Sequence, residues 1–362
     1  MNTDRAHVWL RAETKPLEQR TALTPAGARA LLEAGFEVTV EDSPQNLFPL
    51  DDYRAAGCSI SAAGSWIEAP GAAFILGLKE LDEDDFPLVH RHIYFAHVFK
   101  GQEGADDVLR RFVRGGGALY DLEYLTLEDG RRVAAFGYWA GFAGAALGVM
   151  AWANEQAGSV PPLEPVQSLP SKDELLTRVA AALRTCGTRP VVFVIGAKGR
   201  SGSGAMELAR SLGLETIAWD IEETRRGGPF EEITQADVFV NCVLVARELP
   251  PFVTRELLSA DDRKLSVIAD VSCDPYGPFN PIPIYEACTT FDDPCREVVV
   301  GGKPLHLIAI DNLPSLLPRE SSEDFGDQLV TVLATLDRPD TGVWKRAHDI
   351  VLDHTRHLKH TK

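Results

Sequence analysis

Apolar runs of strand length alternate with segments of helical period over the first third of the chain. The first helical segment, TPAGARALLEAGF, has Thr24 as its expected N-cap, Pro25 in its first turn and Gly35 at its end. Strands separated by helices are typical of a parallel, doubly wound sheet. The predicted strands are HVWLRA at residues 7–12, EVTVEDSP at 37–44, AAFILGLK at 72–79, IYFAHVF at 93–99 and ALYDLEYL at 118–125.

The pattern changes at residues 131–150, RRVAAFGYWAGFAGAALGVM, where small residues predict one long, tightly packed helix leading into a second domain. A strand, turn, helix and strand then follow at residues 191–220. The last forty residues predict helices that return to pack on the first domain. Further strands are predicted at DVFVNCVLV (237–245), LSVIADVS (265–272) and LHLIAI (305–310). We therefore expect an α/β protein with two doubly wound, Rossmann-like parallel-sheet domains.

Composition narrows the class of protein. A length of 362 residues favours two domains, and 45% hydrophobic with 25% charged residues is ordinary for a globular protein. No apolar run approaches the ~18 residues of a membrane span. The segment MNTDRAHVWLRAETKP lacks a basic region followed by an apolar stretch, so we expect no secretory signal and a cytoplasmic location. The net charge of −17 disfavours nucleic acid as a partner. Six scattered cysteines without a C-x-x-C predict reduced thiols and no zinc site.

A glycine-rich turn marks a candidate dinucleotide site. Gly196, Gly199 and Gly202 follow an apolar strand and open a helix, in a G-x-x-G-x-x-G pattern. Glycines let the backbone approach a pyrophosphate, and the helix N-terminus supplies N–H groups. The next strand ends on Asp220, and 220 − 196 = 24, close to the ~20-residue offset of the acidic residue that binds ribose hydroxyls. The alternative is a glycine turn needed only for packing.

The charge at that strand end bears on the choice of cofactor. A carboxylate at Asp220 repels a 2′-phosphate, so NAD is favoured over NADP. Arg225 and Arg226 follow directly and weaken this preference.

Basic residues follow several predicted strands of the first domain. The run RAETKPLEQR places Arg11, Lys15 and Arg20 beyond the first strand, while Lys79 and Lys100 end two others. Ligands of open α/β sheets bind at this edge, and clustered cations suit a substrate with several carboxylates. The alternative for the run, which also holds two glutamates, is a solvated turn of mixed charge.

Histidines lie in the same region. His97 closes a strand and is a candidate catalyst, although a structural histidine is the commoner case. His90 and His92 with His97 resemble a metal triad, but no carboxylate or cysteine pattern supports them, so we expect no metal. The residues alone indicate a nicotinamide-dependent oxidoreductase acting on a substrate that carries carboxylates.

Long motifs add a family resemblance over residues 10–320. The stretches LRAETKPLEQRTALTP, GLKE, FAH, LYDLE, GRRVAAFG, GFAGAALGV and LPSLLPRE resemble the NAD-dependent, lysine-forming saccharopine dehydrogenases. The opening motif is more distantly similar to alanine dehydrogenase and the transhydrogenases. The resemblance implies a substrate-binding domain of residues 1–135 and 319–362, an NAD-binding domain of residues 136–318, and a cleft with hinges near 136 and 318. It also implies a monomer.

The resemblance further implies a reaction, the reversible conversion of L-saccharopine to L-lysine and 2-oxoglutarate, which ends lysine biosynthesis by the α-aminoadipate route. In this family a lysine and a histidine perform acid–base work, and they match Lys79 and His97. A lysine among other cations suits the base that deprotonates a secondary amine, and histidine suits imine hydrolysis near neutral pH. The matching substrate-binding residues are Lys15, Arg20, Glu80, Lys100, Glu123 and Arg131.

The resemblance also implies which residues hold the cofactor. They are Arg132, Phe136, Gly196, Gly199, Arg200, Asp220, Thr224, Leu244, Val271, Ile310, Asp311, Asn312 and Leu313. Three positions depart from the family pattern. Ser201 replaces a cysteine able to pair with one matching Cys242, Asn312 replaces a histidine, and Leu244 replaces a tyrosine.

Two other functions remain open at this point. One is an opine-type or amino-acid dehydrogenase that joins a different amine and 2-oxo acid. The other is a non-catalytic NAD-binding regulator, which would be expected to lose Lys79 or His97, and both are present.

Overall fold

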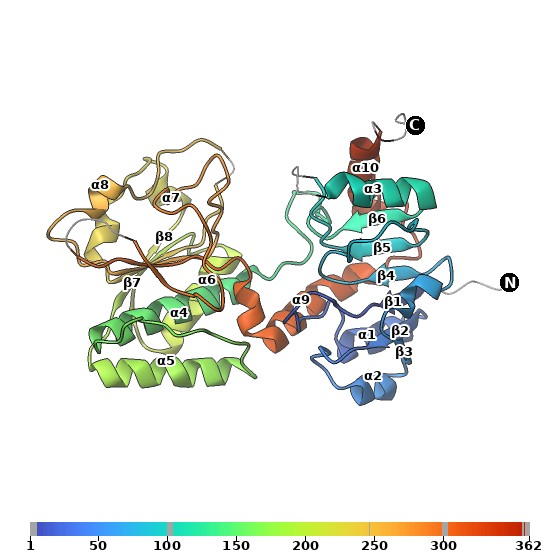
Figure 1. Cartoon of the computed structure of the whole chain (residues 1–362), viewed down its shortest axis with the longest axis horizontal. Helices are drawn as coiled ribbons and strands as arrows, with labels where there is room; N and C mark the ends of the chain where they lie inside the picture. The colour runs from blue at the N-terminus through green and yellow to red at the C-terminus, as the bar shows by residue number, and fades with distance from the viewer. Residues whose placement is uncertain (1–5, 100–103, 246, 299–302, 357, 359–362) are drawn as a thin grey trace. The chain divides into compact units, whose positions relative to one another are not determined.

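The chain folds as two compact units in a computed structural model that describes residues 6–99, 104–245, 247–298, 303–356 and 358 (Figure 1). Unit 1 consists of Met1–Ala135 with Ser321–Lys362, and unit 2 is Phe136–Glu320. In the described part of the chain, none of the helices combines the length and the apolar character that crossing a membrane requires.

Unit 1 is built on six parallel strands in the order β3-β2-β1-β4-β5-β6. From β1 the chain adds strands on one side and then, from β4, on the other, so the order reverses between β1 and β4. Loops that leave such a reversal point diverge and create a ligand site at the carboxyl edge. The strands are β1 (His7–Leu10), β2 (Glu37–Asp42), β3 (Ser59–Ala62), β4 (Phe74–Leu76), β5 (Arg91–Tyr94) and β6 (Ala118–Asp121).

The helices of unit 1 begin where local signals predict. In α1 (Pro25–Glu33) the Thr24 side chain accepts the Gly27 N–H at 3.1 Å, and Gly35 ends the helix with φ of 92°. Trp344 packs edge-on against Tyr120 of β6, 5.6 Å between ring centroids, which places a C-terminal helix on this sheet. The other helices are α2 (Leu50–Ala56), η1 (Ser65–Glu68), α3 (Ala105–Gly115), α9 (Pro318–Leu333) and α10 (Gly342–Thr355).

Unit 2 contains a second six-stranded sheet in the order β11-β12-β10-β9-β7-β8. All pairings are parallel except that of β11 with β12. The order reverses between β7 and β9, so this sheet also has a reversal point. The strands are β7 (Val191–Ile195), β8 (Glu215–Trp219), β9 (Val238–Asn241), β10 (Val267–Asp270), β11 (Arg296–Glu297) and β12 (His306–Ile308). The expected α/β fold with two parallel-sheet domains is confirmed.

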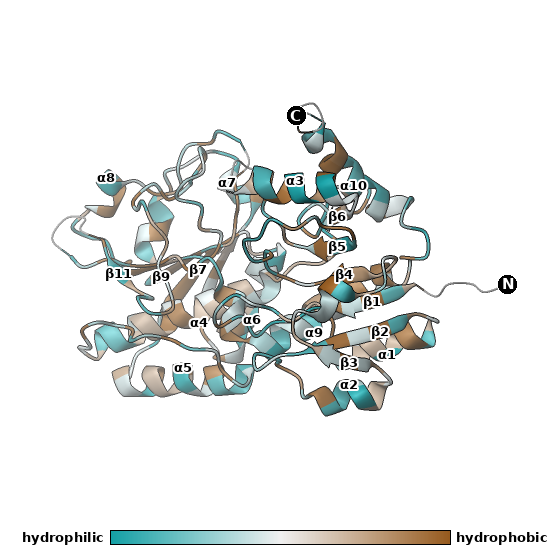
Figure 2. Ribbon diagram, turned by 45° about the vertical axis from the view of Figure 1, so that its right-hand side comes forward, coloured by the Kyte–Doolittle hydropathy of each residue, from teal (hydrophilic) through white to brown (hydrophobic). Residues whose placement is uncertain are grey.

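Both faces of the second sheet are covered by apolar layers. Val192 and Val194 point into one cluster, and the alternate residues Phe193 and Ile195 point into another. Figure 2 shows the corresponding hydrophobic colouring along the central strands and α4. The helices are α4 (Gly137–Gln156), α5 (Lys172–Cys186), α6 (Arg200–Ser211), α7 (Ile221–Thr224), η2 (Glu231–Gln235), α8 (Arg255–Leu258) and η3 (Leu313–Leu316).

Small residues bring α4 and α6 into backbone contact, as their pattern predicts. A Cβ atom added to Gly141 would lie 1.7 Å from the Ser201 carbonyl oxygen, and one on Gly204 would lie 1.9 Å from that of Tyr138. No side chain fits at either position without separating the helices.

One predicted boundary needs correction, and one helix was missed. The long helix expected from residue 131 begins at Gly137, because the preceding segment pairs with an earlier one: Val133 donates to Leu125 and Leu127 to the Arg131 carbonyl, each at 2.8 Å. Helix α5 was not predicted, although Leu175, Val179 and Leu183 recur at helical spacing and are buried. It starts at an N-cap, Ser171, whose side chain accepts the Glu174 N–H at 3.3 Å.

Candidate active site

Lys79 and His97 occupy equivalent positions on neighbouring loops of unit 1. Lys79 is the third residue after β4, and His97 is the third after β5. The two strands are adjacent and parallel, with Leu76 opposite Ile93. The Phe95 N–H also donates to the Leu78 carbonyl at 3.0 Å, so the loops are joined beyond the strands. The structure therefore brings the two predicted acid–base residues to one edge of one sheet.

His97 is paired with Glu80. Its Nδ1–H donates to Oε1 of Glu80, and both side chains are about one-third exposed. Desolvation would raise the pKa of Glu80, but the hydrogen bond from the imidazole, a backbone hydrogen bond and the charges of His97 and Lys79 together lower it to about 2. The same bond raises the pKa of His97 against desolvation and the nearby Lys79. His97 also has φ of 51°, a left-handed backbone conformation that is uncommon outside glycine and occurs often at functional sites.

Glu13 and Arg11, after β1, are buried beside Lys79. Glu13 accepts the N–H groups of Leu78 at 2.6 Å and Lys79 at 2.9 Å. Arg11 lies 3.6 Å from Glu13 and donates through Nη2 to the Lys79 carbonyl. Burial raises the pKa of Glu13, and the charge of Arg11 opposes that rise.

Arg20 is held by a second buried carboxylate. Its Nε and Nη2 donate to the two oxygens of Glu18 at 2.9 and 2.6 Å. Burial would raise the pKa of Glu18, but this two-point interaction lowers it. Lys15, in the same loop, is half-buried. The alternative of a solvated turn of mixed charge is therefore wrong for this segment, because Glu13 and Glu18 are both committed inside the protein.

Asp121, at the end of β6, is a buried carboxylate that the sequence pattern did not single out. It accepts the N–H of Ala96 at 3.3 Å and that of Glu123 at 2.8 Å. Burial raises its pKa to about 6. It thus holds the residue before His97 and the predicted substrate-binding residue Glu123. A carboxylate inside an otherwise apolar stretch of the predicted strand at 118–125 was the available signal.

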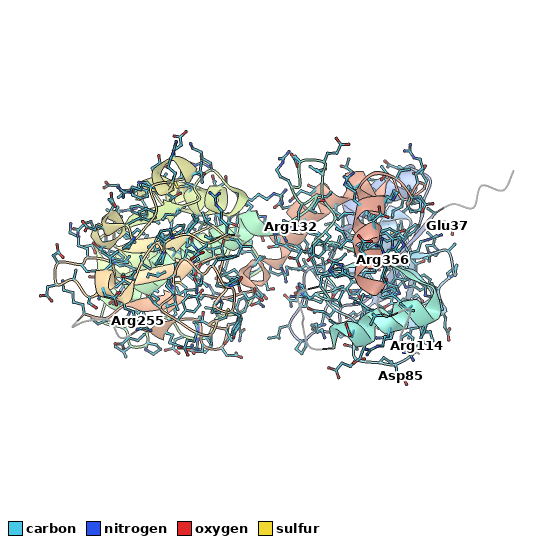
Figure 3. All side chains as sticks on the ribbon, turned by 90° about the horizontal axis from the view of Figure 1, so that it is seen from above. Glu37, Asp85, Arg114, Arg132, Arg255 and Arg356 are labelled. Carbon is cyan, nitrogen blue, oxygen red and sulfur yellow. The ribbon has the colours of Figure 1, made fainter. Side chains whose placement is uncertain are left out.

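Two residues predicted for the site, Arg131 and Arg132, are exposed. Arg131 is exposed, and its Nε donates to Asp129 at 2.6 Å. Arg132, labelled in Figure 3, also lies at an exposed position. Lys100 lies outside the described residues.

In unit 2 the glycine loop fits a dinucleotide cradle. Gly196 has φ of 83°, and an added Cβ would lie 2.7 Å from Val243. A Cβ on Gly202 would lie 1.9 Å from the Gly196 carbonyl oxygen. Gly199 is the N-cap of α6 and provides no capping side chain. The first-turn N–H groups of this twelve-residue helix suit a pyrophosphate.

Asp220 lies directly beside this loop. Its side chain accepts the Lys198 N–H at 2.8 Å and caps α7, while Thr224 donates to its carbonyl at 2.9 Å. Arg226 stacks on Trp219, 5.2 Å from the ring centroid, and donates to Glu232 at 2.6 Å. Arg226 is therefore engaged in a local pair, which removes one argument for a 2′-phosphate site.

The remaining predicted cofactor residues lie after β9, β10 and β12 and at the starts of α4 and α6. A Cβ on Gly144 of α4 would lie 2.6 Å from Val271 and 3.1 Å from Leu313. Ile310 and Leu313 are core residues, so only their backbone groups would reach a ligand. Phe136 directly precedes α4, and Arg200 is the first residue of α6. Leu244, Asp311 and Asn312 have exposed side chains.

A buried polar network beside Val271 was not predicted. Asp270 accepts from Asn241 at 2.9 Å and from the Tyr285 hydroxyl at 2.8 Å. Burial raises the pKa of Asp270 to about 6. The network ties the ends of β9 and β10 together, under the residues proposed for the cofactor.

The other two histidines of the possible metal triad, His90 and His92, are core residues. His90 donates to the Ala69 carbonyl at 2.9 Å, and His92 lies with its ring edge-on to Trp66 and Phe112. Within the described ranges, no group of three His, Cys, Asp or Glu side chains could hold a metal ion.

Comparisons with known proteins show the family of the chain and its fold. Residues 9–143 match the alanine dehydrogenase/PNT N-terminal domain, and residues 230–357 match the C-terminal domain. In solved structures, L-alanine dehydrogenase has a TM-score of 0.67 at 17% identity, covering 97% of this chain and 99% of that one. The transhydrogenase from Sinorhizobium meliloti has a TM-score of 0.65 at 18% identity, covering 94% and 97%. At such identities these structures show the fold alone.

Closer relatives carry one name. The NAD(+), L-lysine-forming saccharopine dehydrogenase of Yarrowia lipolytica is 50% identical over 348 residues, 93% of this chain and 94% of the relative. That of Schizosaccharomyces pombe is 48% identical over 353 residues, 94% and 96% of the two chains. The resemblance predicted from the motifs is confirmed, and the chain belongs to the family of NAD-dependent, lysine-forming saccharopine dehydrogenases.

Proposed function

We propose that the protein catalyses the reversible, NAD-dependent conversion of L-saccharopine to L-lysine and 2-oxoglutarate. One observation carries the proposal: Lys79 and the His97–Glu80 pair lie on adjacent, hydrogen-bonded loops at the carboxyl edge of unit 1. Relatives of 48–50% identity that bear this enzyme's name support the choice of substrate.

NAD fits the residues of unit 2. Glycines and a helix N-terminus without a capping side chain leave backbone N–H groups for a pyrophosphate. Asp220 lies beside this loop and would accept hydrogen bonds from the ribose hydroxyls. We propose that Gly196, Gly199 and Asp220 hold the dinucleotide, with Thr224 supporting Asp220. Bound NAD supplies the hydride acceptor. The domain roles follow, with unit 1 binding the substrate and unit 2 binding the cofactor.

Lys79 is proposed as the base for the secondary amine of saccharopine. Oxidation at the adjacent carbon requires that amine to lose its proton, and an amine side chain is a suitable acceptor. Lys15 and Arg20 are proposed to bind substrate carboxylates, and Glu123 the amino end. Arg131 and Lys100 remain proposals for the same role.

His97 is proposed to move the protons of imine hydrolysis. Glu80 accepts only, so Nδ1 of His97 carries a hydrogen, and Nε2 is the nitrogen that exchanges a proton with the substrate. Glu80 also stabilises the imidazolium form, which keeps a proton donor present near neutral pH.

A reductive amination screen tests the reaction. Purified protein and NADH are offered 2-oxoglutarate, pyruvate or oxaloacetate together with lysine, ornithine, alanine or ammonia. Lysine with 2-oxoglutarate should oxidise NADH fastest and give saccharopine by mass spectrometry. Faster oxidation with another pair would identify a different opine-type or amino-acid dehydrogenase. NADH binding without oxidation of any pair would favour a non-catalytic regulator.

We also propose that the protein acts as a monomer in the cytoplasm. Size-exclusion chromatography with light scattering should give a mass near 39.5 kDa, and a doubled mass would contradict a monomer. Fluorescent tagging of the full chain in its native cell tests the compartment.

A further inference from the structure

Two buried side chains after β1 hold the backbone on both sides of Lys79. The Glu13 carboxylate accepts the N–H groups of Leu78 and Lys79 at 2.6 and 2.9 Å. The Arg11 guanidinium donates to the Lys79 carbonyl. Both peptide units that flank the Lys79 α-carbon are therefore fixed from a different strand, more than sixty residues earlier in the chain.

We propose that Glu13, with Arg11 behind it, is a positioning residue that sets the place of the Lys79 amine. The inference rests on the proposed acid–base role of Lys79. Glu13 and Arg11 would then affect the reaction without touching the substrate, because they hold the backbone of Lys79 in place.

The local structure is shaped around this arrangement. Gly77 lies between β4 and Lys79, and an added Cβ there would be 2.5 Å from Arg11 Nε and 2.6 Å from its Cζ. Only glycine lets the guanidinium lie flat against this turn. Arg11 and Glu13 side chains are 2% and 9% exposed, so each charge depends on the other in a poorly solvated place.

Backbone position matters greatly for a lysine. The four methylenes of the side chain are flexible, so a fixed α-carbon is needed to limit the volume that the amine can search. Misplacement of a catalytic group by about 1 Å costs on the order of 100-fold in rate. A shift of Leu78 would also reach the His97 loop, because Phe95 donates to the Leu78 carbonyl at 3.0 Å.

The direct test is Glu13→Gln. Glutamine keeps one oxygen and replaces the other with an NH₂ group, which faces the second N–H as donor against donor. We expect kcat to fall by roughly 10- to 100-fold, with little change in NADH affinity by fluorescence titration. Amide hydrogen exchange by mass spectrometry should be faster across residues 78–79.

Three variants control this result. Glu13→Asp keeps the charge beside Arg11, so it should fold even if the glutamine variant does not, and it should also lower kcat because it is one methylene shorter. Asp237→Asn removes a carboxylate of unit 2 that accepts the Val191 N–H at 2.8 Å. It should speed exchange at residue 191 and leave residues 78–79 protected. Glu33→Gln changes an exposed glutamate and should leave kcat unaltered.

A double-mutant cycle identifies the path of the effect. Glu13→Gln should lower the residual kcat of Lys79→Met by less than about twofold, because the group it positions is already gone. An equal loss in both backgrounds would overturn the inference, as would Glu13 variants with full kcat and unchanged exchange. If Lys79→Met itself keeps full turnover, the proposed role of Lys79 fails. The exchange data then still decide whether Glu13 holds the segment.

Discussion

Each of the two sheets has its candidate site at the point where the strand order reverses, but the two sites are built from different groups. One uses titratable side chains and the other uses backbone groups. At and beside the reversal point of unit 1, the loops carry titratable residues held by carboxylates: Glu13 accepts the backbone N–H of Lys79, and Glu80 pairs with the imidazole of His97. At the reversal point of unit 2, the loop after β7 carries glycines whose missing side chains leave room for backbone groups. Parallel sheets of one general fold thus produce one site rich in side-chain chemistry and one that depends on bare backbone.

The difference predicts different sensitivities. A site that moves protons needs particular groups at particular points, so removal of a functional group should change turnover more than binding. A site that binds through backbone N–H groups needs space, so addition of a methyl group should change binding first.

The largest effect is expected for Lys79→Met combined with His97→Gln. Both groups proposed to move protons are then absent, and kcat should fall by about 1,000-fold or more, since each such group contributes on the order of 100- to 10,000-fold. Steady-state NADH oxidation with lysine and 2-oxoglutarate measures the loss. NADH affinity should remain within a few-fold by fluorescence titration. Turnover close to that of the unmodified protein would disprove the acid–base assignment.

A large effect on binding is expected for Gly202→Ala. The new methyl carbon would lie 1.9 Å from the Gly196 carbonyl oxygen, which forces α6 away from the loop that forms the cradle. We expect NADH affinity to fall by roughly 10- to 100-fold, measured by isothermal titration calorimetry. The matched change Gly199→Ala places a methyl 3.2 Å from the same oxygen and should have a smaller effect. Equal losses for the two variants would contradict the steric explanation.

These predictions depend on features that the sequence reveals to different degrees. The glycine loop and the Thr24 cap were predictable because each is a local signal, complete within a few residues. The burial of Glu13 was not, because its partners at residues 78–79 are brought close only when β1 and β4 pair. A run of mixed charges has the same sequence pattern whether its side chains are buried or exposed to solvent, so the sequence alone does not distinguish the two cases.

Boundaries and backbone conformation were harder still. The start of α4 was misplaced because residues 133–136, VAAF, are as apolar as the helix itself, and the pairing of Val133 with Leu125 decides the conformation of this segment. The left-handed φ of His97 has no local signal, since glycine or asparagine is the usual residue there. Such conformations are imposed by the surrounding fold.

The smallest effect, and the sharpest probe of unit 1, is expected for Glu80→Gln. The carboxylate raises the pKa of His97 by stabilising the imidazolium, so its removal should lower that pKa and shift the histidine limb of the pH–rate profile to lower pH. We expect kcat near neutral pH to fall by on the order of tenfold. NMR titration of the His97 imidazole measures the shift directly. Because a raised histidine pKa stabilises the folded state below the unfolded pKa of about 6.5 and loses this contribution as pH rises through the folded value, Glu80→Gln should destabilise the protein more at pH 6 than at pH 9. An unchanged histidine titration would show that Glu80 does not control the proton on His97, and the contrast between the two sites would then rest on Lys79 alone.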